Sequence, residues 1–171
     1  MKLNNLIFTA LAGFSIILAG FQNNDENEQH YDNKLFISAS NFTKEILFKA
    51  GDTNVETGLS VAIAKPEEHD IKVTMSPAPE LLSTYKLAYY DETAVLLSEE
   101  HYSMPETSTT IKSGSIVSPE LPIEFINTGE LDIKTTYVLP VTIKSVEGIG
   151  VLQSAKTYYY VCLLYTSDAA D

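Results

Sequence analysis

The sequence has 171 residues, with 23 acidic side chains, 11 basic ones, a single cysteine and no tryptophan. This length allows one domain of about 130–150 residues around one hydrophobic core, and two packed domains are excluded. All 11 basic residues are lysine, and the net charge is −12. Such a charge repels phosphate backbones, and arginine is the side chain best suited to forked phosphate contacts, so nucleic-acid binding is excluded.

Residues 1–20 are predicted to be a signal peptide of the lipoprotein type. Lys2 precedes an apolar run at 6–18, which has the length of a secretory core segment and is too short to span a bilayer of about 30 Å. The run ends in Leu-Ala-Gly, which resembles a bacterial lipoprotein signal, but Phe21 stands where such a signal has the lipid-bearing cysteine. A sequencing error or an inactivating change accounts for this departure. A buried N-terminal helix and plain secretion are the alternatives.

Residues 21–33 follow as a flexible acidic tether, with acidic side chains between Asp25 and Glu28. Acidic residues after a lipid site also resemble the surface-export signal of Bacteroidetes lipoproteins. We therefore expect an exported protein at the outer membrane or cell surface, or otherwise a periplasmic or secreted one. Attachment to the membrane by a lipid requires cysteine at position 21.

The segment 34–162 is predicted to be the folded domain, and it reads as short strands separated by turns. Apolar residues alternate at period two, which is typical of half-buried strands, at 59–64, 71–75, 121–125 and 137–143. In each segment we expect the odd-numbered residues to face inward. Pro122 and Pro140 would then face outward, and they favour edge strands or bulges because proline cannot donate to a strand ladder.

A single helix is predicted, at 79–85, where Pro79 precedes leucines and a tyrosine at helical spacing. Many short strands and almost no helix favour an all-β fold. We predict an immunoglobulin-like antiparallel β-sandwich of about seven strands with one short helix.

The last nine residues, 163–171, have neither strand alternation nor a helix cap and resemble the translation of a sequencing adapter. The domain is accordingly expected to end at Cys162. The lone cysteine can form no internal disulfide, and we expect a small buried apolar side chain in preference to a reactive thiol.

Several segments together are similar to an uncharacterised N-terminal domain of Bacteroidetes surface lipoproteins. That domain follows the lipid anchor and precedes another module, such as a family-18-type endoglycosidase barrel or a laminin-G-like sandwich. The resemblance covers about residues 31–161. It implies an immunoglobulin-like sandwich in a glycan-foraging protein and implies no catalytic residue. The segments that carry the resemblance are 96–102, the Ile-Lys-Ser-Gly turn within 110–114, the Tyr-Val-Leu-Pro-Val-Thr-Ile strand within 136–143, and 157–161.

The residues carry no recognisable catalytic, cofactor or metal motif. His69 and His101 each follow two glutamates, and imidazole with carboxylate suits zinc, but both triplets lie in expected turns that fix no geometry. Solvated turns are therefore favoured over a metal site. Nucleophile elbows, calcium loops and phosphate cradles are not recognisable. We predict that the chain is not an enzyme and uses no cofactor.

Tyrosines are the candidate contacts for glycans, because sugars stack on aromatic rings. Tyr158 and Tyr160 point to one face of a strand, about 7 Å apart, and Tyr89 and Tyr90 form a second candidate pair. Core packing and cross-strand pairing are the competing interpretation, and we favour it.

We therefore predict a non-catalytic N-terminal domain of a cell-surface bacterial lipoprotein. Its expected partner is a downstream glycan-binding or glycan-cleaving module of the same polypeptide, which it would space or support. One alternative is a carbohydrate-binding module that contacts glycans through surface tyrosines. Another is an adhesin or fimbrial subunit that pairs through open sheet edges.

Overall fold

The computed structural model describes residues 32–50 and 54–165. These residues contain twelve strands, one α-helix and four 3-10 turns, and none of their helices is long and apolar enough to cross a membrane. The predicted signal peptide at 1–20 lies outside the described residues, as do tether residues 21–31 and tail residues 166–171.

The larger sheet has β12 and β10 at its centre. Its strand order is β2-β12-β10-β5-β8, and the short β6 also pairs with β10. The strands are β2 (Thr43–Lys49), β5 (Ile71–Pro77), β6 (Val95–Leu96), β8 (Ser108–Ile111), β10 (Tyr137–Val146) and β12 (Thr157–Tyr165).

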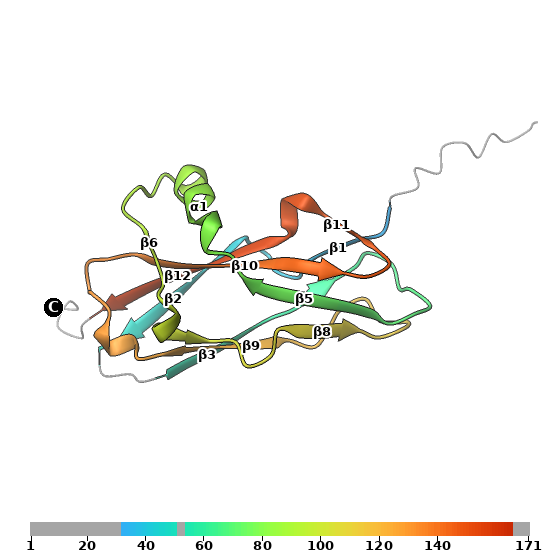
Figure 1. Ribbon diagram of the computed structural model, residues 1–171, viewed down its shortest axis with the longest axis horizontal. Helices are drawn as coiled ribbons and strands as arrows, with labels where there is room; N and C mark the ends of the chain where they lie inside the picture. Colours follow the sequence, from blue (N-terminus) through green and yellow to red (C-terminus); the bar gives the residue numbers. More distant parts are fainter. Residues whose placement is uncertain (1–31, 51–53, 166–171) are drawn as a thin grey trace, which may run out of the picture. The chain divides into compact units, whose positions relative to one another are not determined.

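A second sheet faces this one, and a third closes one end (Figure 1). Phe125 of the second sheet packs against Phe48 and Tyr160 of the larger sheet, with ring centroids 5.5 and 5.7 Å apart. The predicted all-β sandwich is therefore confirmed. The second sheet contains β3 (Asn54–Leu59), β9 (Leu121–Ile126) and β7 (Tyr102–Ser103), and the third contains β11 (Gly150–Val151), β1 (Lys34–Ile37) and β4 (Val61–Ala62).

The expected inward faces are confirmed by burial. The odd-numbered residues of all four alternating segments, except Tyr137 at the start of β10, are at most 7% exposed. Each such leucine, isoleucine or valine contributes about 1.5–3 kcal/mol by leaving water. These residues are Leu59, Val61, Ile63, Ile71, Val73, Met75, Leu121, Ile123, Phe125, Leu139, Val141 and Ile143.

The segment 59–64 was expected to be one strand, but the chain changes sheet within it. Leu59 pairs with Leu121 in the second sheet, whereas Val61 pairs with Ile37 in the third. Between them the carbonyl of Ser60 accepts a hydrogen bond of 2.9 Å from the amide of Ser38. The alternation of buried and less buried residues continues where the chain passes from one sheet to the other, because Leu59, Val61 and Ile63 are all buried.

Three strand pairs are parallel, which corrects the expectation of a purely antiparallel sandwich. They are β2 with β12, β1 with β11, and β6 with β10. Parallel pairing requires a long connection between the two strands, and each of these pairs is separated by several intervening elements. Alternation within a strand reports which face is buried and carries no information about the direction of a neighbour.

Pro140 lies in a central strand, so the expectation of an edge strand is wrong for this residue. The carbonyl of Pro140 accepts a hydrogen bond of 2.9 Å from the amide of Ala78, and in an extended strand the nitrogen faces the same edge as the carbonyl. On that edge β6 pairs with Tyr137 and Val138, and β5 pairs from Val141 onward. The prolyl nitrogen thus occupies the break between two partners and costs no ladder hydrogen bond.

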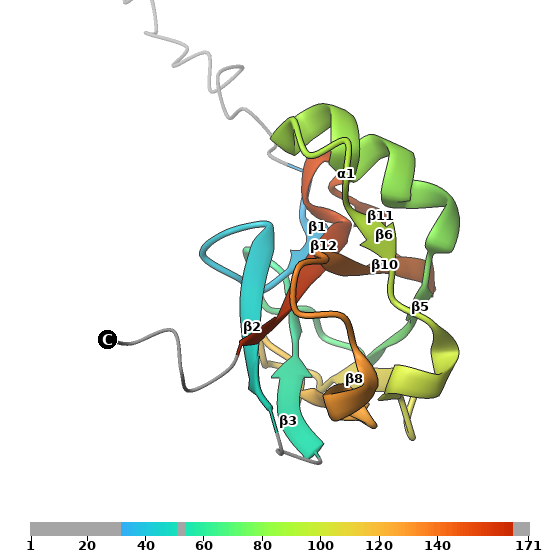
Figure 2. The same ribbon diagram turned by 90° about the vertical axis from the view of Figure 1, so that its left-hand side faces the viewer.

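The predicted helix is confirmed and is longer than expected. A 3-10 turn, η1 (Pro79–Leu81), leads into α1 (Leu82–Tyr89). Tyr90 ends the helix in the left-handed region, at φ 56°, where its amide bonds to the carbonyl of Lys86. The helix lies on the side of β10 and β12 that faces away from β3 (Figure 2), and Tyr85 and Val138 are buried together in the small apolar cluster between them.

The last strand runs past the expected end of the domain. β12 continues through Tyr165, and its residues 163–165 pair in register with Leu47, Phe48 and Lys49 of β2. Leu164 is 5% exposed. The segment 163–165 therefore has the strand structure that its sequence did not reveal, whereas its origin stays a prediction. The remaining 3-10 turns are η2 (Glu99–His101), η3 (Thr128–Glu130) and η4 (Gln153–Ala155).

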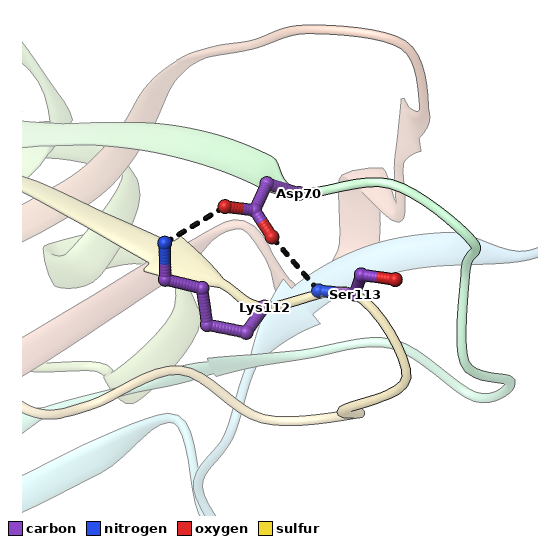
Figure 3. Close-up of polar contacts among 3 residues, drawn as sticks. All are labelled: Asp70, Lys112 and Ser113. Atoms are coloured by element: carbon purple, nitrogen blue, oxygen red, sulfur yellow. Dashed lines mark hydrogen bonds and ion pairs between the residues drawn. The ribbon is translucent and has the colours of Figure 1, made fainter.

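The Ile-Lys-Ser-Gly segment forms a turn that Asp70 holds (Figure 3). One Asp70 carboxylate oxygen lies 2.8 Å from Nζ of Lys112, and the other accepts a hydrogen bond of 2.9 Å from the amide of Ser113. Gly114 takes φ 78°, which suits glycine. The hydrogen bonds from Lys112 and Ser113 hold the pKa of Asp70 below its ordinary value, and this segment therefore has a structural role.

We predict that Asp70→Asn lowers the melting temperature at pH 7 and that the difference from wild type narrows in acid. The lowered pKa stabilises the fold above the unfolded value of about 3.9, and this stabilisation is lost as the pH falls through the folded value. Thermal unfolding of both proteins at pH 7 and at about pH 3 measures it. An equal difference at both pH values would contradict the role of the charge.

Candidate functional site

Three tyrosines gather where α1 crosses the outer face of the larger sheet. Tyr85 and Tyr89 lie one helical turn apart and so share a face of α1, with ring centroids 4.9 Å apart. Tyr159 of β12 lies 5.4 Å from the first ring and 6.1 Å from the second. Tyr85 and Tyr159 are buried, whereas Tyr89 is 41% exposed, so the cluster presents one partly open ring to solvent.

A groove of about 310 Å³ opens beside this cluster, and we name it the outer groove. Phe42, which directly precedes β2, also lines this groove and is 50% exposed. The amide of Tyr159 donates a hydrogen bond of 2.9 Å to the carbonyl of Phe42, which fixes that loop against β12. The outer groove is lined by Phe42, Leu81, Thr84, Ala88, Tyr89, Gln153, Ser154, Lys156, Thr157 and Tyr159.

Polar side chains from η4 and the start of β12 form one rim of the outer groove. Gln153 is held by a hydrogen bond of 3.3 Å from its amide nitrogen to the carbonyl of Val151. Among residues 32–50 and 54–165, Lys112 and Asp70 form the only ion pair, so the Lys156 ammonium is not engaged by a carboxylate there. The rim thus offers amide, hydroxyl and ammonium donors.

Burial raises the pKa of both Tyr85 and Tyr159, and the negative charge of Asp91 raises that of Tyr85 further. Both phenols therefore stay protonated and uncharged at neutral pH. The described residues lining the outer groove include no histidine, cysteine or carboxylate. The groups that the lining does offer are aromatic rings, hydroxyls, an amide and an ammonium.

A second hollow, of about 450 Å³, lies where the edge of β10 changes partner from β6 to β5. Buried Leu97 and Leu139 line it together with Glu99 and Glu100. These carboxylates come from consecutive residues of η2.

Tyr158 and Tyr160 belong to the core, which corrects their candidate role as a sugar platform. They are 6% and 0% exposed, and their rings contact each other at 5.1 Å. The hydroxyl of Tyr160 donates a hydrogen bond of 3.4 Å to the carbonyl of Gly58 in the facing sheet. Burial raises the pKa of both phenols. Neither ring has a face open to a ligand.

Tyr89 and Tyr90 lie near the outer groove, but only Tyr89 lines it. Tyr90 is 93% exposed beyond the end of α1. Phe42, Gln153 and Lys156 were not predicted from the sequence. Phe42 could be recognised from the sequence only as an aromatic residue just before a strand. It lies beside Tyr159 because β2 and β12 pair in parallel, with Thr43 opposite Tyr159, and this pairing is not visible in the sequence.

The two histidine triplets lie in turns. The Nδ1 atom of His101 is 3.1 Å from the carbonyl oxygen of Asn127, and His69 precedes the Asp70 turn. Within the part of the chain that the structure describes, no three histidine, cysteine, aspartate or glutamate side chains are grouped to hold a metal ion. Cys162 is fully buried, as expected, and burial raises the pKa of its thiol.

Comparisons with known proteins identify one family model and several solved structures that are similar to this chain. The model of a family of N-terminal domains matches residues 31–150, and no curated protein matches the sequence. A candidate carbohydrate-binding protein from Bacteroides ovatus has a TM-score of 0.65 at 19% identity, over 76% of this chain and 36% of its own.

Two further solved structures are similar. A two-domain protein of unknown function from Bacteroides fragilis has a TM-score of 0.61 at 16% identity, over 79% of this chain and 46% of its own. EndoBT-3987 from Bacteroides thetaiotamicron, solved with a Man5GlcNAc product, has a TM-score of 0.60 at 17% identity, over 70% of this chain and 28% of its own. The chain thus spans less than half the length of each, and the shared feature is the fold.

We predict that Tyr160→Ala lowers the free energy of unfolding by about 3–5 kcal/mol, since it removes a large buried ring. Tyr90→Ala is the matched control, and it should change stability by less than about 0.5 kcal/mol because that side chain is almost fully exposed. Urea unfolding followed by circular dichroism measures both. Equal effects of the two substitutions would contradict the assignment of Tyr160 to the core.

Proposed function

Since the chain belongs to this family of N-terminal domains, we propose that it is the non-catalytic N-terminal domain of a cell-surface bacterial lipoprotein. In this role it spaces or supports a downstream module that binds or cleaves glycans. The match to an N-terminal domain family carries the proposal. The lengths of the three similar Bacteroides proteins support it, because each contains more chain than this fold occupies.

The path of the chain through the sandwich suits a spacer. β1 begins at one end of the sandwich, and β12 ends at the opposite one (Figure 1). Six residues of β12, Thr157–Cys162, pair with β10, and the strand also pairs with β2. A load along β12 would act on all of these hydrogen bonds together, so the exit strand is a firm attachment point for a following module.

A non-catalytic role agrees with the chemistry of the two hollows. The described lining of the outer groove carries no acid, and Glu99 and Glu100 of the second hollow are neighbours in one turn. In this proposal, glycan cleavage belongs to another module of the same protein. EndoBT-3987 supports this division, because this fold covers 28% of that chain.

The role of support is tested with the complete surface protein, once genomic sequence past the codon for Tyr165 defines the following module. We expect cells that display the protein without residues 34–165 to capture less polysaccharide, while the purified module keeps its affinity. An unrelated sandwich of similar length should restore capture.

A stop codon directly after this segment, or release of glycan by the present chain alone, would contradict the support role. Fibres formed by the purified chain would favour the structural-subunit alternative. Capture that does not change on deletion would also count against support, because the domain would then contribute nothing to access.

The lipoprotein origin rests on the sequence around Phe21, outside the described residues. We predict that Phe21→Cys makes the chain incorporate radiolabelled palmitate in a Bacteroides host and move to the membrane fraction, whereas Phe21→Ser does not. The thiol is the group that becomes acylated, and serine is a matched control of similar size. Failure of the cysteine variant to incorporate lipid would contradict a lipoprotein signal.

A further inference from the structure

We propose that the outer groove is a binding site for a short stretch of a neutral oligosaccharide, with Tyr89 and Phe42 as its stacking surfaces. This inference goes beyond the support role, because binding here requires no other module. The groove volume of about 310 Å³ lies at the low end of the range for small-ligand sites, about 300–1,000 Å³. The groove therefore suits a short segment of a chain that extends into solvent.

The exposed aromatic rings of the outer groove are the first reason to expect a sugar ligand. A pyranose ring presents C–H groups with partial positive charge, and the face of an aromatic ring is negative, so the two attract. Tyr89 and Phe42, which line the groove together with Tyr159, are 41% and 50% exposed. The ring of Tyr89 combines open area with a fixed backing, since it lies against Tyr85 and Tyr159. Phe42 is positioned through its backbone, because its carbonyl accepts a hydrogen bond from the amide of Tyr159.

The polar side chains that line the outer groove are the second reason to expect a sugar ligand. Thr84 on α1 and Gln153, Ser154 and Lys156 also line the groove, so a sugar stacked on the rings would have polar side chains available for its hydroxyl groups. These groups donate or accept hydrogen bonds, and the Lys156 ammonium has no carboxylate partner in the described part of the chain. A purely aliphatic ligand would leave this rim unpaired, which favours a saccharide over a lipid chain.

Charge decides between neutral and acidic saccharides. The chain has a net charge of −12, which repels an anionic polysaccharide as it approaches. The described lining of the groove includes no carboxylate, so a neutral ligand enters without desolvating one, which would be costly. Lys156 can donate hydrogen bonds to sugar hydroxyl groups, but a single positive charge does not offset the repulsion between an anionic glycan and a chain of net charge −12.

The site is also held in shape before binding. Tyr159 lies in the central strand β12, and its amide holds the carbonyl of Phe42. Thr157 is fixed by its hydroxyl contact of 3.1 Å with the hydroxyl of Thr142 on β10. A groove built on paired strands and a packed helix loses little freedom on binding, which favours affinity.

The test is binding of the purified full chain to an array of neutral oligosaccharides, with uronate-containing and sialylated glycans as the acidic set. The strongest neutral glycan is then titrated calorimetrically. We expect Tyr89→Ala and Phe42→Ala each to weaken binding about tenfold, and Tyr90→Ala to leave it unchanged. Saturation of the protein's aromatic protons should transfer signal to the C–H protons of the bound sugar.

Tyr89→Leu provides a second variant that keeps the apolar contact with Tyr85 and Tyr159, and it should weaken binding although the fold is preserved by circular dichroism. The proposal would be overturned by no binding on the neutral array, by stronger binding of the acidic set, or by binding that all three groove variants leave intact. None of these results bears on the support role, which is tested by deletion in the complete protein.

Discussion

Burial of β12 from both sides is the constraint on which this structure depends. Tyr158, Tyr160 and Cys162 point between the sheets, where the first two contact each other and Tyr160 meets Phe125. Tyr159 and Val161 point outward and are covered by α1. The same strand therefore forms the wall of the core and the floor of the outer groove, and its pairing with β10 and β2 fixes both.

Much of the fold was predictable because alternation reports burial directly. Ile71, Val73 and Met75 were expected inside and are fully buried. The parallel pairing of β2 with β12 was not predictable, because side-chain periodicity carries no strand direction. The expectation that Pro140 lies in an edge strand was wrong for a related reason. A central strand accommodates this proline only because β10 changes partner there, from β6 to β5, and periodicity does not reveal such a change. The strand at 163–165 was missed because its three consecutive apolar residues show no alternation in sequence, although their burial differs: Leu164 is 5% exposed and Tyr165 is 44% exposed.

The candidate site was predictable only in part. Tyr89 was predicted as a candidate glycan contact in the segment after the predicted helix. Tyr160 was predicted as the same kind of candidate, although it is buried. What separates them is the position of α1, which leaves the ring of Tyr89 partly open, and the register that sets Phe42 beside Tyr159. Both are tertiary facts. A domain with a rigid core and one aromatic groove outside it is consistent with supporting a glycan-directed module while contacting the glycan itself.

Native-state hydrogen exchange tests the central claim most directly. If β12 is held by two paired strands and by apolar cover on both faces, its amides at Tyr159, Tyr160 and Val161 should exchange among the slowest in the domain, at rates near those for global unfolding. The amides of Tyr90 and its neighbours, which follow the end of α1, should exchange far faster. Equal exchange in these two segments would contradict the role of β12 as the shared wall of core and groove.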